Sequence, residues 1–410
     1  MRAFFWECRM DTGRIGQRIA YWRDRRGFTQ QDFGRLMGQS KRWVQDLEGG
    51  KRQTDPRLSV LVRTAEVLHI PLEQLLSDRP PEPAAGTAPP DEVLAVVDAL
   101  YPLEDLPIDA ADPLQLEVLH RRLIYCCEAF QACHYQALAR DLPALLVAAQ
   151  KAAANTPVER MCEAFGLLSR VLQLTTSFLH KYGPGAAVQA AVVADRALAA
   201  AERSEDPVQI GAASRRVAKS LMYQQRPQAA VDFAVTTARR LEADLTGRGP
   251  LGLSTLGMLY LNAARSAAGV QTASTLVDHA ADVADQQGQD LNEDWTMFGP
   301  TNVDLHRIGM LVRFEDGWSA LDAAAGLNRG KVMGMTKERR AEHHIAKAHA
   351  SLLTRRKEQA AEQLLKADEL APEEVRSRPD VVRLVKDVVG ATAQPGAQLR
   401  ALAHRCGLQA

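Results

Sequence analysis

The chain has 410 residues, which is too long for one compact helical core, so two or more folding units are expected. Hydrophobic residues make up 46% and aromatic residues only 5%, which favours an all-α protein over a β-sandwich. No apolar run is long enough to cross a bilayer, and residues 1–10 lack the basic-then-apolar order of a signal peptide. We therefore expect a cytoplasmic protein with no membrane partner; translation starting at Met1 and at Met10 both remain open.

Charge is divided unevenly along a chain whose formal net charge is zero. Residues 14–79 hold thirteen Lys and Arg against eight Asp and Glu, a balance of +5. Residues 80–410 hold thirty-five against forty, a balance of −5. A basic head on an acidic body indicates that the head is the part that meets a polyanion.

Residues 14–77 have the pattern of a small five-helix domain. Gly27 is expected to end the first helix, Thr29 and Ser40 to cap the second and third, and Gly38 to form the turn between those two. Two short helices joined at a glycine turn can present the second one to a DNA major groove. The five helices are expected at residues 14–26, 30–37, 41–48, 58–68 and 72–76.

The head carries a specific resemblance. The run FTQQDFGRLMGQS at residues 28–40, followed by Val44-x-x-Leu47-Glu48-x-Gly50-Lys51-Arg52, resembles the XRE family of helix-turn-helix repressors, the lambda and 434 repressor group. The match covers the whole head, about one sixth of the chain. It implies a lambda-repressor-like fold and a buried Arg–carboxylate pair between Arg23 and Glu48.

The resemblance also assigns DNA contacts. It puts Lys41, Arg42 and Asp46 on the groove-facing side of the third helix. Arg or Lys can donate to guanine and Asp can accept from cytosine, and a good bidentate contact discriminates between bases by ~1–3 kcal/mol. Trp43 departs from the family pattern, and both a contact to DNA and packing at the domain surface remain open. The expected DNA-binding residues are Gln30, Ser40, Lys41, Arg42, Trp43, Asp46, Lys51, Arg52 and Arg57.

Among these residues, some are expected to bind phosphates without reading sequence. Gln30 matches the family position that grips a phosphate, and Lys51 and Arg52 match the basic loop after the recognition helix. Arg57 is expected to neutralise a phosphate as well.

Residues 78–91 read DRPPEPAAGTAPPD, and their five prolines exclude a continuous helix or strand, which predicts a linker. Residues 92–410 then show a helical pattern that repeats. Small or apolar pairs four positions apart recur at intervals of 40 to 47 residues, which marks close helix contacts. The pairs are Ala144/Ala148, Ala187/Ala191, Ala229/Phe233, Ala273/Val277, Ala320/Ala324 and Ala360/Leu364.

Parts of these repeats resemble tetratricopeptide helices. Leu256-Gly257-x-x-Tyr260 matches part of a first helix, and Ala360, Leu364, Ala367 and Pro372 match a second helix. We expect an α-solenoid of helical hairpins with a concave surface.

The segment WTMFGPTN at residues 295–302 has two interpretations. It is either a hydrophobic staple with a helix N-cap or a ligand-lining corner. Asparagines on first helices could clamp a peptide backbone, as in the RRNPP peptide-pheromone receptors that the whole-chain layout resembles. The expected ligand-binding residues are Tyr260, Asn262, Asn302, His306 and Arg307.

Other patterns do not predict chemistry. Residues 247–252 have the letters of GxGxxG but follow a helix, and the spacing of His343, His344 and His349 does not suit a metal. The six cysteines form no CxxC pair, and no nucleophile-base motif is present. We expect no enzyme activity, no metal and no cofactor.

These patterns favour a sequence-specific transcription regulator that binds double-stranded DNA as a homodimer. Its repeat body would sense a peptide, a small molecule or a protein and mediate dimerisation. The alternative is a protein-protein interaction scaffold or antitoxin-like adaptor in which DNA binding by the head is secondary.

Overall fold

The computed structural model describes residues 15–26, 28–49, 56–68, 70, 72–76, 91–101, 116–392 and 394–408. The regular structure of these residues is helical, apart from one isolated β-bridge between Leu291 and Phe298. The prediction of an all-α protein is therefore confirmed. No helix in this part of the chain is long and apolar enough to cross a membrane.

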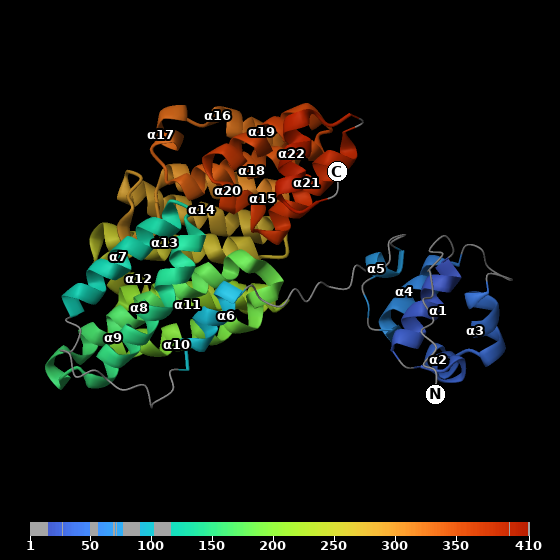
Figure 1. Ribbon diagram of the computed structural model, residues 1–410, viewed down its shortest axis with the longest axis horizontal. Helices are drawn as coiled ribbons and strands as arrows, with labels where there is room; N and C mark the ends of the chain where they lie inside the picture. The colour runs from blue at the N-terminus through green and yellow to red at the C-terminus, as the bar shows by residue number, and fades with distance from the viewer. Residues whose placement is uncertain are drawn as a thin grey trace. The chain divides into compact units, whose positions relative to one another are not determined.

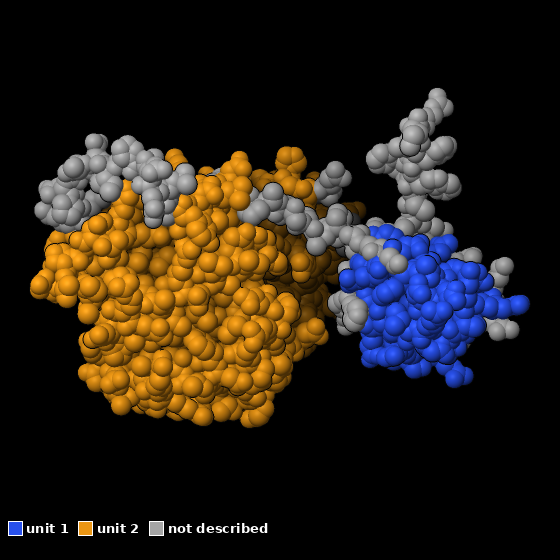
Figure 2. Space-filling view, turned by 90° about the horizontal axis from the view of Figure 1, so that it is seen from below, with its two compact units in different colours: residues 1–87 blue, residues 88–410 orange. Residues whose placement is uncertain are grey.

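The chain separates into two compact units, residues 1–87 and residues 88–410, coloured in Figure 2. The boundary falls within the proline-rich segment 78–91, of which residues 78–90 lie outside the described residues. The predicted domains, 14–77 and 92–410, fall in separate units.

The first unit has five helices among its described residues, and their bounds agree with the sequence expectation within one residue. Thr29 caps the second helix, because its hydroxyl accepts from the Asp32 N–H at 3.1 Å and donates to the Asp32 carboxylate at 2.6 Å. Gly38 ends that helix with φ of 68°, in the left-handed region that glycine adopts without strain. The helices are α1 (Ile15–Arg25), α2 (Gln30–Met37), α3 (Lys41–Glu48), α4 (Leu58–Leu68) and α5 (Leu72–Leu76).

The core of the first unit joins all five helices. Ile19, Phe33, Val44 and Leu68 are fully buried in it. Gly16 allows α1 to approach the end of α3, since a Cβ on Gly16 would lie 2.3 Å from the Leu47 carbonyl oxygen. The orientation of α3 is therefore set by apolar packing and by a backbone contact that requires glycine.

The second unit consists of helices from α6 to α22, with three short 3₁₀ segments (Figure 1). Its first half contains α6 (Asp91–Asp98), α7 (Leu116–Gln131), α8 (Tyr135–Asn155), η1 (Val158–Arg160), α9 (Met161–Leu179), η2 (His180–Ala186), α10 (Ala187–Ser204), α11 (Pro207–Tyr223) and α12 (Pro227–Thr246). Its second half contains α13 (Gly249–Ser266), α14 (Val270–Gln287), η3 (Glu293–Trp295), α15 (Pro300–Arg313), α16 (Gly317–Gly326), α17 (Arg329–Met333), α18 (Lys337–Leu353), α19 (Lys357–Leu370), α20 (Pro372–Arg376), α21 (Pro379–Ala391) and α22 (Ala397–Arg405).

Helices of the second unit pack in two ways. Each long helix contacts the next one in sequence, as α9 contacts α10 and α13 contacts α14. Alternate helices also pack on one another in a continuous series, namely α7, α9, α11, α13, α15, α18 and α21. We call this series the inner helices.

The small-residue pairs expected from the sequence lie on the helices between the inner ones. Three of the six pairs are buried as expected, and the other three were assigned to the wrong alanines. Ala273/Val277, Ala320/Ala324 and Ala360/Leu364 are buried as expected. In the three earlier repeats Ala144, Ala187 and Ala229 are not buried, and the buried pairs are Ala149/Ala153, Ala190/Ala194 and Ala230/Ala234. Neighbouring alanines on α8, α10 and α12 made several registers equally compatible with the pattern.

Gly257 of the tetratricopeptide-like motif provides space for an aromatic ring. A Cβ at this position would lie 1.9 Å from the Cζ atom of Phe298, which is fully buried. Phe298 lies in the segment between α14 and α15, just before Gly299, which has φ of 154°. Because Gly257 on α13 has no side chain, the ring of Phe298 packs against its backbone, and this contact positions the start of α15.

Replacement of Gly257 by alanine is expected to lower the free energy of unfolding by about 1–3 kcal/mol, because the ring of Phe298 must move out of a packed core. Chemical denaturation followed by circular dichroism measures this change. The matched control is Gly390→Ala on α21, where nothing lies within 4 Å and the change should stabilise by about 0.5–1 kcal/mol. Equal effects of the two substitutions would contradict this account of Gly257.

The beginning and the end of the second unit are joined by an ion-pair network. The Nζ atom of Lys181, in η2, lies 2.6 Å from Glu338 Oε1 of α18 and also contacts Glu374 of α20. Glu374 is fully buried, accepts from the Tyr135 hydroxyl and pairs with Arg378 at 2.8 Å. Arg378 also pairs with Glu342 of α18 at 2.6 Å. We call these six residues the closure network.

Removal of the ammonium group in Lys181→Met is expected to lower the free energy of unfolding by about 3–5 kcal/mol, because Glu374 keeps its charge in a buried site. Urea denaturation of the full chain measures the loss. Lys366→Met provides the control, since Lys366 and Glu362 form an exposed pair on α19 that contributes at most about 0.5 kcal/mol. Similar effects of the two substitutions would mean that the closure network does not hold the unit together.

Candidate functional site

Helix α3 forms the first candidate site, and its start is defined by local hydrogen bonding. The Ser40 hydroxyl accepts from the Trp43 N–H at 3.2 Å, as expected of an N-cap residue. Val44 and Leu47 face the core, which places the side chains of Lys41 and Arg42 on the exposed side. Ser40, among the expected DNA-binding residues, therefore also has a structural role.

The predicted Arg–carboxylate pair is present in the first unit. Arg23 Nε donates to Glu48 Oε1 at 2.6 Å, and a second bond joins Arg23 Nη2 to Glu48 Oε2 at 3.2 Å. Both side chains are buried, and the hydrogen bond that Arg23 donates to Glu48 raises the pKa of the guanidinium. Arg23 also donates to the Phe28 carbonyl at 2.8 Å. The pair connects α1 with the end of α3, as the resemblance implied.

Gln30 lies in the same hydrogen-bond network. Its Nε2 donates to Glu48 Oε2 at 2.8 Å, and its Oε1 accepts from Gln45 at 3.3 Å. The first residue of α2 is thereby tied to α3. The side chain expected to grip a phosphate is already oriented by contacts inside the unit.

The other expected DNA-binding residues differ in exposure. Arg57 is exposed, Asp46 is half-buried, and Trp43 is half-buried with packing against the core. Trp43 thus packs at the domain surface, and its other alternative, a contact to DNA, stays a prediction. Lys51 and Arg52 lie outside the described residues.

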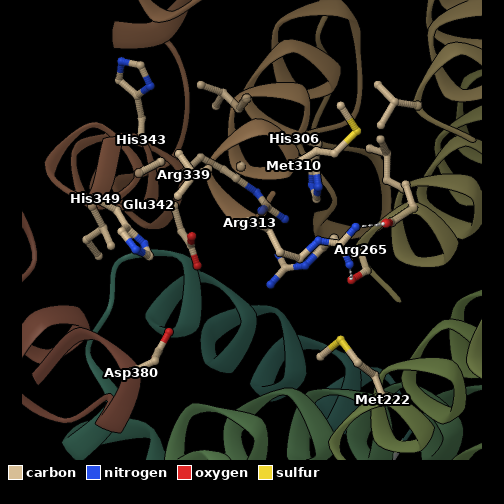
Figure 3. Close-up of a pocket in the computed structure, with 18 of the residues that line it drawn as sticks. Met222, Arg265, His306, Met310, Arg313, Arg339, Glu342, His343, His349 and Asp380 are labelled. Atoms are coloured by element: carbon tan, nitrogen blue, oxygen red, sulfur yellow. Dashed lines mark hydrogen bonds between the residues drawn. The ribbon is translucent and has the colours of Figure 1, made fainter. Parts of the chain in front are cut away.

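The second candidate site is a cavity of about 380 Å³ in the second unit, bounded by inner helices (Figure 3). Arg265 extends into it from α13, His306 and Arg313 from α15, and Arg339 from α18 (Figure 3). Apolar side chains complete the wall: Met222, Leu261, Ala264, Val277, Leu305, Met310, Val312, Ile345 and Ala346.

Burial and positive charge dominate the electrostatics of the cavity. Burial, with the nearby charges of Arg339 and Arg265, holds the pKa of His306 well below its usual value. Burial and Arg265 also lower the pKa of Arg313. The Nε2 atom of His306 has no hydrogen-bond partner among the residues that the structure describes. The cavity therefore holds a neutral imidazole among guanidinium groups.

The expected ligand-binding residues are not brought together in this cavity. His306 lines it, whereas Asn302 is fully buried with its amide 3.6 Å from Met258 Sδ and its Oδ1 unpartnered. Tyr260 is buried and stacks edge-on against His279. The remaining two residues bond locally, Asn262 to the Met258 carbonyl and Arg307 to Asp278. A clamp formed by Asn262 and Asn302 is thus not supported by their positions.

The WTMFGPTN segment contains features of both interpretations. Phe298 and Val303 belong to one core cluster, as a hydrophobic staple requires. The cap itself differs from expectation, because Gly299 has no side chain and the Asp290 carboxylate accepts from the Thr301 N–H at 2.9 Å. Trp295 lies beside a small pocket, not in the large cavity.

Two motifs excluded at first have structural explanations. Gly252 of the GxGxxG-like run lies where α13 meets the end of α12, and a Cβ there would lie 1.8 Å from the Leu245 carbonyl oxygen. His344 shares a hydrogen bond of 2.8 Å with Gln363, while His343 and His349 line the cavity. The histidine-rich part of α18 is therefore part of the cavity wall.

The cavity arginines are the candidate-site residues that sequence reasoning missed. Arg265, Arg313 and Arg339 come from three different helices, and none belongs to a recognisable motif. The signal that could have found them is their position on α13, α15 and α18, three helices that follow one another in the series of inner helices. No protein-family model matches the sequence, and the comparison with curated proteins gave no match.

The buried histidines predict a loss of stability in acid. His343 has its pKa lowered by burial, Lys347 and His344 from the usual 6.5 to about 4, so it stays neutral in the fold. The unfolded chain takes up this proton below about pH 6.5, and the free energy of unfolding therefore falls between about pH 6.5 and 4. A shift of this size corresponds to a contribution on the order of 3 kcal/mol.

Urea denaturation at several pH values measures this slope. His343→Gln should make it shallower, while His404→Gln on the exposed side of α22 should leave it unchanged. Below about pH 4.5 a second loss is expected, because ion pairing holds the pKa of Glu374 at about 2 against the effect of burial. A stability that stays constant from pH 7 to 4 would contradict this account.

Proposed function

We propose that the protein is a sequence-specific DNA-binding transcription regulator of the XRE type. The observation that carries the proposal is the pair α2–α3. It has a glycine turn, a capped third helix with Lys41 and Arg42 exposed at its start, and the Arg23–Glu48 pair behind it. This is the arrangement that a recognition helix needs to reach base edges while its orientation stays fixed.

In this proposal the groups on α3 have separate roles. Lys41 and Arg42 donate to guanine, and Asp46 accepts from cytosine. Arg57, Lys51 and Arg52 neutralise phosphates, with Gln30 at the start of α2. A single head covers one half-site, so the protein acts as a homodimer on double-stranded DNA.

We further propose that the second unit is a tetratricopeptide-like solenoid that senses an effector and mediates dimerisation. The succession of packed inner helices and the cavity among them support this role. A regulator of this kind is a cytoplasmic protein without enzyme activity.

The proposal is tested by selecting bound fragments of genomic DNA with the full chain and titrating the selected site. Arg42→Ala is expected to weaken specific binding roughly 5–150-fold, the loss of about 1–3 kcal/mol of base recognition. Arg63→Ala on α4, an exposed residue paired with Glu66, is the matched control and should change affinity little. Arg57→Ala should weaken all sequences equally and reduce the salt slope by about 1.

Two results would reject the assignment. If Lys41→Ala and Arg42→Ala bind the selected site as tightly as Arg63→Ala, α3 is not the recognition helix. If no fragment is bound above the nonspecific level at physiological salt, the interaction-scaffold alternative is favoured.

A further inference from the structure

The cations on the inner helices greatly outnumber the anions available to them. Arg265 and Arg339 line the cavity, and the described residues offer neither one a carboxylate partner. Arg313 donates to the backbone carbonyls of Ala264 and Arg265 and likewise pairs with no carboxylate. Arg215 on α11 is buried and has no hydrogen bond or ion pair among the described residues, and its charge reaches His306. Of these four arginines Arg215 is buried, Arg339 is half-buried, and Arg265 and Arg313 are exposed. Like charges gathered at one cavity repel one another, and an anion bound among them relieves that repulsion.

The carboxylates nearby are already paired. Glu342 and Asp380 line the cavity, but both contact Arg378, at 2.6 Å and 2.7 Å. Glu338 is held by Lys181 at 2.6 Å, and Asp294 by Arg170 at 2.7 Å. These carboxylates are therefore neutralised by Lys181, Arg378 and Arg170, and the cavity keeps an excess of positive charge. The rest of the sequence does not explain this excess, because residues 80–410 carry a net charge of −5.

The size and the lining of the cavity indicate that its ligand also has an apolar part. Its volume of about 380 Å³ lies within the range of small-molecule sites. The guanidinium groups and His306 gather in its centre (Figure 3), while Leu261, Val277 and Val312 supply apolar wall. A ligand that fits both surfaces has one oxyanion group and an apolar portion.

We propose that this cavity binds a small organic anion, with a carboxylate or phosphate group held by Arg265 and Arg339 and an apolar part against α13, α14 and α15. Planar guanidinium groups bind such oxyanions through two parallel hydrogen bonds each. His306 donates a further hydrogen bond from its unpartnered Nε2. The inference rests on the sensing role proposed above and specifies the chemical class of the effector.

Titration calorimetry of the full chain with three six-carbon probes tests the proposal without DNA. The probes are hexanoate, hexyl phosphate and neutral hexanol, each at the same ionic strength in chloride buffer. At least one of the two anions is expected to bind, and hexanol is not. Comparison of hexanoate with hexyl phosphate then identifies the preferred head group.

Three variants assign the binding to the cavity. Arg339→Gln and Arg265→Gln should each weaken binding of the anion by about tenfold or more, through loss of a charge-assisted bidentate contact. Arg240→Gln, on the exposed side of α12, is the control and should bind like the parent chain. Without ligand, Arg339→Gln should also raise the midpoint of thermal unfolding because like charges are fewer, whereas loss of a merely structural residue would lower it.

Several results would overturn the proposal. These are no binding of either anion, binding of hexanol as strong as that of the anions, or equal affinities for Arg265→Gln and Arg240→Gln. Arg265 is exposed, so its substitution reports on binding even if Arg339→Gln does not fold. Because the measurement contains no DNA, its failure leaves the DNA-binding proposal untouched, and failure of DNA binding leaves this result valid.

Discussion

The ion pair between Lys181 and Glu374 is the interaction on which the rest of the second unit depends. It joins η2, near the beginning of the unit, to α20, near its end. Glu374 in turn holds Arg378, and Arg378 holds Glu342 on α18. Since Arg378 and Glu342 both line the cavity, the same contacts that close the array position one wall of the candidate ligand site. An open series of helices would have no such fixed wall.

The closure also determines the sign of the charge in the cavity. Four carboxylates of the region, Glu338, Glu342, Glu374 and Asp380, are held by Lys181 and Arg378. Within the described part of the chain, Arg265 on α13 and Arg339 on α18 then have no acidic partner. A body with net negative charge can thus have a positive interior, because overall composition does not say where charges pair.

The helices of the head could be predicted from local sequence signals. The arrangement of the body could not, because it depends on contacts between residues far apart in the sequence. Thr29, Gly38 and Ser40 start or end a helix through contacts to residues a few positions away. The helices that they delimit lie where the sequence indicated. The pocket contains Arg265, Arg313 and Arg339, which are 26 or more positions apart and which only the stacking order of the helices brings together. Gly257 likewise matched a motif, but glycine is needed there because the ring of Phe298, forty-one residues later, packs against it. The register of the alanine pairs was ambiguous because alanine occupies adjacent positions on the same helices.

The closure network also governs when the newly made chain can become stable. In an open repeat array each unit contacts only its neighbours, so stability grows as each repeat leaves the ribosome. Here Tyr135 and Lys181 contact partners 239 and 157 to 193 residues later, so the burial of Lys181 has no compensating charge until α18 and α20 are synthesised. The head, whose Arg23–Glu48 pair spans 25 residues, is complete long before that point. The ion pairs that join the two ends of the body can therefore form only late in synthesis.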